Sequence, residues 1–278
     1  MDKKELRILV IGAHPDDADQ FASGTSVKFA AAGACVRFLS TCNGDKGHHL
    51  MSCADVAARR KGETARAAAV LGIDRYDVWD VPDCELEPTL ELRKEMTRYV
   101  RAFAPHIIFT HRTCDYHADH RATAQLVQDM TYMLGVPHWC PETPIPAVVP
   151  AVFFMTDDFD FPRMLRPDVA VDVDAEMDRV CDAFASHVSQ AFEWLPFDMK
   201  LGPEDVPDPN DRAAVRAFIR KWYVPCKRTD AVRFHDRLVE WYGAANPPQN
   251  VEVFEMSRYG RQMSEAELRD TFLFDYVH

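Results

Sequence analysis

Short apolar runs alternate with stretches of helical length along the first half of the chain. Residues 6–12 form an apolar run that predicts a buried strand, and residues 19–32 predict a helix rich in small residues. Gly33 follows this helix, where a left-handed cap suits glycine, and residues 34–41 predict a second strand. This order of strand, helix and strand is typical of a parallel sheet.

The same alternation continues to about residue 190. Further helices are predicted at residues 54–71, 89–103, 117–134 and 175–190, and further strands at 76–81, 106–110, within 147–155, and at 169–173. The proline-rich residues 137–150 predict an irregular excursion. We therefore expect an α/β fold, Rossmann-like and three-layered, with a mostly parallel sheet and functional residues at the carboxyl ends of its strands.

Beyond Glu193 the pattern changes to helices that contain Trp and Tyr. Helices are predicted at residues 211–222 and 230–242 and a strand at 251–255. We expect a core at residues 1–192 and a C-terminal extension at 193–278 that packs on it within one structural domain. For the aromatic residues of the extension, core packing is favoured over a substrate cap or a subunit interface; they are Trp222, Tyr223, Trp241 and Tyr242.

Composition narrows the classes of partner. The 278 residues are 47% hydrophobic and 27% charged, which predicts a chain folded throughout. The net charge of −12 is spread along the sequence, which argues against nucleic acid or an anionic membrane as the main partner. The first apolar run is too short for a signal peptide or a membrane span, so we expect a cytoplasmic protein. The composition is also compatible with a homo-oligomer.

Cysteine spacing gives no structural zinc motif. The eight cysteines include no CxxC pair, so reduced thiols are expected, and Cys114 is only a weak candidate for a nucleophile.

Two clusters of histidine and aspartate follow predicted strands. Taken alone, the residues from His14 to Asp17 could form a turn with a helix cap, and the residues from His117 to His120 a solvated helix start. Their joint occurrence at two strand exits favours a catalytic site instead.

The residue types in these clusters suit a hydrolytic metal centre. A catalytic zinc takes three protein ligands and keeps a fourth position open, and His14, Asp17 and His120 can supply that set. Asp16 then remains as a base for the water proton. His117 is expected to face the same cavity, and Asp119 to orient its ring and favour its protonated form, so that it stabilises an oxyanion.

The two clusters resemble the motifs of the LmbE-like or PIG-L-like de-N-acetylases, which are AHPDD and HxDH. The resemblance implies metal ligation by His14, Asp17 and His120, a general base at Asp16, and a catalytic histidine with its orienting carboxylate at His117 and Asp119. It implies Zn²⁺ as cofactor, with Fe²⁺ or another divalent ion as the alternative. Further matching segments extend it over about residues 6–190; they are residues 41–47, Arg60 with Glu63, residues 81–83, and residues 187–190.

Arg60 and His187 carry weaker expectations. By the resemblance Arg60 binds sugar hydroxyls or an anionic substituent of the substrate, with an exposed helix arginine as the alternative. His187 is expected to be a buried or helix-end histidine rather than a catalytic one.

The chain also departs from the family pattern. Ala18 and Asp19 follow the paired aspartates where the family carries Glu, Ser23 and Gly24 replace a double glycine, and Val180 replaces a lysine. The residues expected to bind metal and proton are unchanged, so these departures bear on the substrate more than on hydrolysis.

The expected function is metal-dependent hydrolysis of an N-acetyl or other N-acyl group on a small amino sugar or its conjugate, by metal-activated water. Within the family, the alternative is an amidase that acts on a larger amide, such as a thiol conjugate or an acylated glycopeptide. A non-catalytic Rossmann-like nucleotide binder is the alternative from another class, but residues 12–14 lack the GxGxxG turn. Asp16→Ala is predicted to keep the metal and lose turnover.

Overall fold

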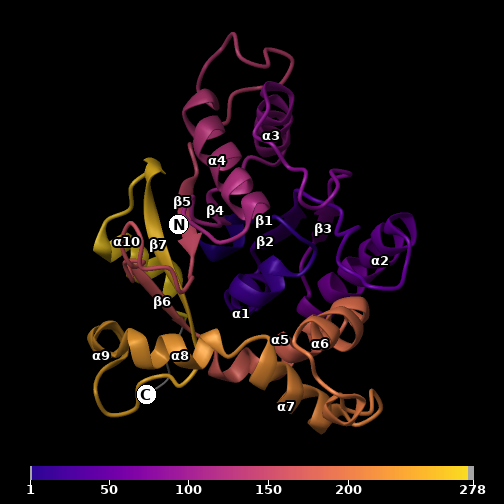
Figure 1. Ribbon diagram of the computed structural model, residues 1–278. Coiled ribbons are helices and arrows are strands. Elements are labelled where there is room, and N and C mark those ends of the chain that lie inside the picture. Colours follow the sequence, from indigo (N-terminus) through magenta and orange to yellow (C-terminus); the bar gives the residue numbers. More distant parts are fainter. Residues whose placement is uncertain (1, 275–278) are drawn as a thin grey trace.

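The computed structural model describes residues 2–274 and shows a seven-stranded sheet in the order β3-β2-β1-β4-β5-β7-β6 (Figure 1). Five successive strands along the chain are parallel: β1 (Arg7–Gly12), β2 (Cys35–Ser40), β3 (Arg75–Val78), β4 (Ile107–Thr110) and β5 (Ala151–Met155). β7 (Val251–Gly260) runs antiparallel to both of its neighbours, β5 and β6 (Val169–Asp172). The prediction of an α/β fold with a mostly parallel sheet is confirmed.

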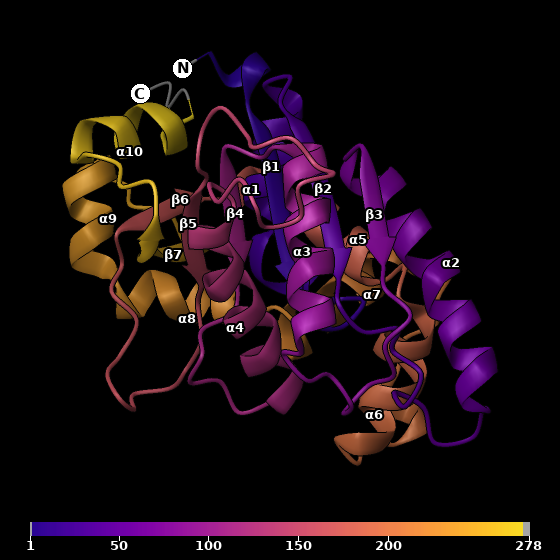
Figure 2. The same cartoon turned by 90° about the horizontal axis from the view of Figure 1, so that it is seen from above.

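Helices cover both faces of the sheet (Figures 1 and 2). One face packs against α1 (Asp17–Ala31), α2 (Cys53–Leu71) and α5 (Met177–Phe184), and the other against α3 (Leu90–Phe103) and α4 (Ala118–Met133). The alternation of side chains along β1 explains the three layers, because Ile8 and Val10 lie in the first apolar cluster whereas Leu9 and Ile11 lie in the second.

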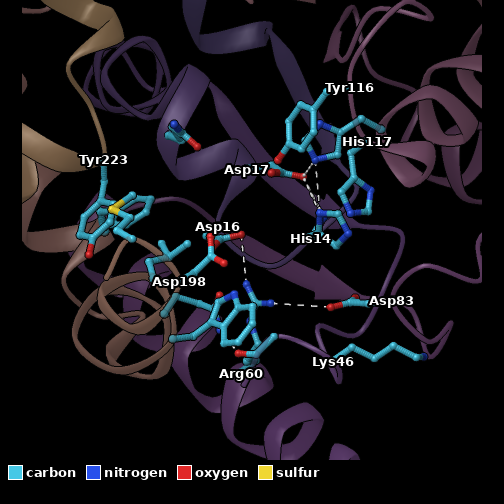
Figure 3. A pocket seen from close by; sticks show the side chains of 18 of the residues that line it. His14, Asp16, Asp17, Lys46, Arg60, Asp83, Tyr116, His117, Asp198 and Tyr223 are labelled. Carbon is cyan, nitrogen blue, oxygen red and sulfur yellow. Dashed lines mark hydrogen bonds and ion pairs between the residues drawn. The ribbon is translucent and has the colours of Figure 1, made fainter. Parts of the chain in front are cut away.

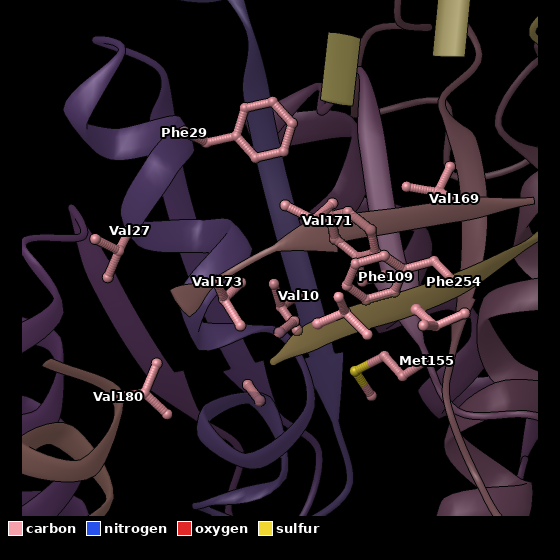
Figure 4. Close-up of a cluster of buried hydrophobic side chains, with 14 of the residues drawn as sticks. Val10, Val27, Phe29, Phe109, Met155, Val169, Val171, Val173, Val180 and Phe254 are labelled. Carbon is pink, nitrogen blue, oxygen red and sulfur yellow. The ribbon is translucent and has the colours of Figure 1, made fainter. Parts of the chain in front are cut away.

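The region expected as an extension also contributes to the sheet. Its helices are α6 (Leu195–Asp198), α7 (Arg212–Trp222), α8 (Cys226–Arg233), α9 (His235–Tyr242) and α10 (Glu265–Phe272). Its strand β7 lies between β5 and β6, and the Phe254 ring packs 4.4 Å from the Phe109 ring of β4, measured between centroids (Figure 4). This region therefore completes the hydrophobic core of the sheet.

A buried ion pair joins the same region to α1. Lys227 of α8 and Glu252 of β7 form a salt bridge, and each side chain is 1% exposed. The Glu252 carboxylate accepts from the backbone N–H groups of Gly24 and Thr25 at 2.8 and 2.7 Å, and Lys227 Nζ donates to the Gln20 carbonyl at 2.9 Å. Lys227 and Glu252, both from the C-terminal region, thus satisfy backbone groups in the middle of α1.

Two predicted helices are shorter than expected. The helix expected at residues 175–190 ends at Phe184, and a π-helix, η3 (Ser189–Trp194), follows a turn that contains His187. The helix expected at residues 230–242 is divided at Phe234, whose backbone leaves the helical region at φ −112° and ψ 28°. Within residues 2–274, none of the helices has the length and apolarity that crossing a membrane requires.

Candidate active site

The two predicted clusters meet at the carboxyl edge of the sheet. β1 and β4 are parallel neighbours, and the chain turns to β2 on one side of β1 before it returns to β4 on the other. Such a switch in strand order opens a crevice in which ligands of α/β proteins bind. His14 and Asp17 follow β1, and His120 lies in the first turn of α4, after β4.

His14, Asp17 and His120 bring three ligand atoms together. His14 Nδ1 lies 3.6 Å from Asp17 Oδ2 and 3.3 Å from His120 Nε2, and His120 Nε2 lies 3.4 Å from Asp17 Oδ2. Ligand atoms around a tetrahedral zinc, with metal distances of about 2.0–2.1 Å, are about 3.3–3.4 Å apart. The donor types and spacing therefore fit a divalent cation.

Each ligand has a partner behind it. Asp119 Oδ2 lies 3.1 Å from His14 Nε2, and Asp115 Oδ1 lies 3.0 Å from His120 Nδ1, so both rings turn their other nitrogen toward the cation position. His111 Nε2 lies 3.1 Å from Asp17 Oδ2, and the His111 ring stacks on that of His120. Partners of this kind fix the orientation of metal-binding imidazoles.

The charges around these groups also favour a cation. Burial lowers the pKa of His14, but hydrogen bonds to Asp119 and Asp17 outweigh it and raise the pKa to about 10. For His120, burial is likewise outweighed by Asp17 and Asp115, and the pKa rises to about 9. Burial alone would raise the pKa of Asp17, yet the neighbouring histidines hold it well below its usual range. The local field stabilises positive charge where the three ligand atoms meet.

His117 lies beside this group but is oriented differently from the prediction. It is the N-cap of α4, and its Nδ1 accepts from the Asp119 backbone N–H at 3.1 Å, so the neutral ring carries its proton on Nε2. Burial and the positive charge of His14 and His120 lower the pKa of His117. Asp119 Oδ2 is 3.8 Å from His117 Nδ1 and 3.1 Å from His14 Nε2, so its carboxylate orients His14 and not, as we expected, His117.

Asp16, which is partly exposed, pairs with the buried Arg60 on the wall of the site (Figure 3). Asp16 Oδ1 lies 3.0 Å from Arg60 Nη2, which also donates to the Pro15 carbonyl at 2.7 Å. Burial raises the pKa of Asp16, although the Arg60 charge opposes this. Because Arg60 is 2% exposed, the alternative of a solvent-exposed arginine is wrong, and its guanidinium holds the Asp16 carboxylate in place.

The other predicted segments support this wall from behind. Glu63, which is fully buried, accepts from the Ser189 backbone N–H at 2.9 Å and from its hydroxyl at 2.6 Å. Gln190 donates to the Gly47 carbonyl at 2.7 Å, which fixes the loop after β2. His187 Nε2 lies 3.1 Å from Asp19 Oδ2, and both side chains are fully buried beneath the site, as expected for a structural histidine.

A cavity of about 470 Å³ opens over these residues (Figure 3). Its floor includes residues of the two clusters. One wall is formed by η3 and the residues that follow it, which are Gln190, Trp194, Leu195, Asp198, Met199, Trp222 and Tyr223. Tyr223, Trp241 and Tyr242 are buried in the core and Trp222 packs against it, as predicted. Trp222 and Tyr223 also line the cavity.

Sequence reasoning missed Asp115 and His111. Both lie in the segment between β4 and α4, where His111 follows the strand directly and Asp115 stands two residues before His117. Their signal was a histidine and a carboxylate at the exit of a strand already expected to carry ligands. The fold and these grouped side chains define an α/β protein with a candidate metal centre at the switch point of its sheet.

Comparison with known proteins places the chain more closely. Residues 9–131 match the family described as PIG-L, GlcNAc-PI de-N-acetylase, which confirms the predicted resemblance. A diacetylchitobiose deacetylase from Thermococcus kodakarensis is 28% identical over 201 residues, which are 69% of this chain and 74% of that protein. A 1D-myo-inositol 2-acetamido-2-deoxy-alpha-D-glucopyranoside deacetylase 2 from Saccharopolyspora erythraea is 28% identical over 58% of this chain and 68% of its own.

Solved structures share the fold over almost the whole chain. An N,N'-diacetylchitobiose deacetylase from Pyrococcus horikoshii superposes with a TM-score of 0.70 at 21% identity, covering 90% of this chain and 83% of its own. GalB, a 4-carboxy-2-hydroxymuconate hydratase from Pseudomonas putida, gives 0.70 at 17% identity over 93% of this chain and all of its own. One fold thus carries both a deacetylase and a hydratase, so the fold alone does not select the reaction.

Proposed function

We propose that this protein is a metal-dependent hydrolase that removes an N-acyl group, most simply acetyl, from an amino sugar or an amino-sugar conjugate. The triangle of His14 Nδ1, Asp17 Oδ2 and His120 Nε2, with Asp16 beside it, carries the proposal. The relatives named as deacetylases of acetylated amino sugars support the choice of an amide as substrate.

The expected cofactor is Zn²⁺, with Fe²⁺ as the alternative, and His14, Asp17 and His120 would hold it. Such an ion supplies Lewis acidity toward water and toward the amide carbonyl. Asp119 and Asp115 keep the two imidazoles turned toward it. The donor set of two histidines and one carboxylate is one that catalytic zinc uses.

We assign the proton transfers of the reaction to Asp16. Its carboxylate accepts a proton from the attacking water and later gives that proton to the nitrogen of the departing amine, as the C–N bond breaks and acetate forms. Because burial raises the pKa of Asp16, its protonated form is accessible during turnover, which suits a group that must both take and return a proton. Arg60 holds the carboxylate at one oxygen and leaves the other for the reaction.

His117 is placed to stabilise the oxyanion. Since Nδ1 is occupied by the Asp119 backbone N–H, the neutral ring donates through Nε2. A neutral donor serves this purpose when it is fixed in advance, and the N-cap bond fixes it.

The cavity wall indicates what surrounds the acyl group. The indoles of Trp194 and Trp222 offer apolar faces, and the charged groups of Asp198 and Lys46 offer partners for hydroxyls. A sugar ring, with apolar C–H faces and polar edges, matches this mixture. The larger-amide alternative is retained as an arm of the test, because the cavity of about 470 Å³ also admits a bulkier conjugate.

Amine release from three substrate types tests the proposal. The zinc-loaded protein is incubated with N-acetylglucosamine, with diacetylchitobiose and with a bulky N-acyl amide, and free primary amine is measured. We expect release from at least one acetylated sugar, and an Asp16→Asn variant that keeps its metal but is about 10²- to 10⁴-fold slower. Release confined to the bulky amide would select the larger-amide alternative. No release from any substrate by metal-loaded protein, or equal rates for Asp16→Asn, would refute the proposal.

A further inference from the structure

A solvent-accessible thiol stands beside two of the residues described above. Cys84 lies in the loop after β3, lines the cavity and is exposed. Its Sγ, one ring nitrogen of His117 and one carboxylate oxygen of Asp119 all lie within 4.8 Å of one another. The Cys84 backbone N–H donates to Asp119 Oδ2 at 2.7 Å, which fixes the loop against that carboxylate.

The Asp119 carboxylate has one oxygen to spare. Oδ2 accepts from the Cys84 N–H and lies 3.1 Å from His14 Nε2, whereas Oδ1 is buried and receives no N–H or O–H donor from residues 2–274. Asp119 is 1% exposed, and a buried carboxylate oxygen without a partner is unfavourable unless a donor or a cation satisfies it. Cys42 lies on the buried side of the same carboxylate, so Cys84 is the thiol that solvent can reach.

We propose that Cys84, His117 and Asp119 form a second divalent-cation site next to the first. One thiolate, one imidazole and one carboxylate are a donor set for Zn²⁺, Co²⁺ or Cd²⁺, and a poor one for Mg²⁺, because thiolate is a soft ligand. On binding, the Cys84 thiol proton leaves to solvent, and one oxygen of the Asp119 carboxylate gains the cation as a partner.

Occupation of this second site removes His117 from the reaction. Because Nδ1 accepts from the Asp119 N–H, the cation would take the lone pair of Nε2, and this nitrogen could then no longer donate a proton to an oxyanion. The cation would also fill part of the cavity. This consequence rests on the proposed function, whereas the binding of the cation does not. Activity should therefore rise as the first site fills with zinc and fall as zinc is increased further.

Cobalt binding tests the site without any assay of activity. A thiolate bound to Co²⁺ gives a charge-transfer band in the near ultraviolet, which imidazole and carboxylate ligands do not give. We expect the band in the wild-type protein, its loss in Cys84→Ser, and one equivalent less of bound Co²⁺ in that variant by equilibrium dialysis. Cys53→Ser is the matched control, because Cys53 is also exposed and stands at the start of α2, away from the cavity.

Alkylation gives a second measurement on the unmodified chain. Cd²⁺ should slow the reaction of iodoacetamide with Cys84, read by peptide mass spectrometry, and leave Cys53 unaffected, while Mg²⁺ should slow neither. The same band and the same stoichiometry in Cys84→Ser, or unchanged alkylation of Cys84 with Cd²⁺, would overturn the proposal. Binding without inhibition at high zinc would leave the second site standing and refute the role proposed for His117.

Discussion

Asp115 Oδ1 lies 3.0 Å from Nδ1 of His120, and the other nitrogen of that ring lies 3.3 Å from His14 Nδ1 and 3.4 Å from Asp17 Oδ2. Asp115 also accepts from the backbone N–H of His117 at 2.9 Å. One carboxylate in the segment before α4 thus orients a proposed metal ligand and the start of the helix that carries it.

The first prediction concerns this carboxylate. Asp115→Ala should weaken zinc binding about 10- to 100-fold, because the His120 ring loses the partner that fixes its tautomer and its direction. Competition with a chromophoric chelator measures the affinity. Asp158→Ala is the control, since Asp158 is 96% exposed and forms an ion pair with Arg233, which is not one of the proposed ligands. Equal affinities in the two variants would show that Asp115 does not orient His120.

The second prediction separates two roles for Arg60. If Arg60 positions Asp16, Arg60→Met should lower kcat by about 100-fold through misplacement of the base, with little change in KM. The Arg60 charge lowers the pKa of Asp16, so its loss should move the acidic limb of the kcat profile to higher pH. A rise in KM with kcat and the limb unchanged would instead assign Arg60 to substrate binding.

The third prediction tests the buried ion pair between Lys227 and Glu252, which binds backbone groups of α1. Lys227→Met leaves the buried Glu252 without its counter-charge and should lower the free energy of unfolding by about 3–5 kcal/mol. Urea denaturation measures it, with the exposed Lys61→Met as control. Adding Glu252→Gln to Lys227→Met should recover part of the loss. A loss below about 1 kcal/mol, as exposed pairs give, would contradict the structural role.

The fourth prediction concerns pH. Burial raises the pKa of Asp230 to about 6, although the Arg233 guanidinium opposes this from 3.9 Å. The folded state therefore holds this proton more tightly than the unfolded state, so its contribution to stability is present below the ordinary pKa and is lost as pH rises through about 6.

Asp230→Asn removes this titration. Relative to the variant, the wild type should lose stability on the order of 3 kcal/mol as pH rises from about 4 to above 6. Thermal or urea unfolding across this range measures the difference, and the exposed Asp236→Asn should follow the wild type. A constant difference between Asp230→Asn and the wild type would contradict the raised pKa.

Local pattern predicted most of the elements. The expected strand at 34–41 is β2 (Cys35–Ser40), and the expected helix at 89–103 is α3 (Leu90–Phe103), because each is defined by periodicity and by a cap within its own sequence. The two clusters could be brought together for a similar reason, since parallel neighbouring strands expose their carboxyl ends at one edge.

Contacts between segments that are far apart in the sequence could not be predicted from local pattern. The strand expected at 251–255 extends to Gly260 and enters the sheet between β5 and β6, because its pairing is decided by partners far away in the sequence. The orientation of Asp119 toward His14 depends on where two loops meet, and adjacency to His117 in the sequence gave the wrong partner. Asp115 was missed for the same reason.

The insertion of β7 limits how this chain can be recombined. A chimaera that exchanged the residues after η3 for those of a relative would remove an internal strand of the sheet as well as Glu252, which binds two backbone groups of α1. The cavity wall with Trp222 would be exchanged in the same step. Transplanting substrate preference should therefore succeed by single substitutions on α7 and around α6, and fail by exchange of the whole segment.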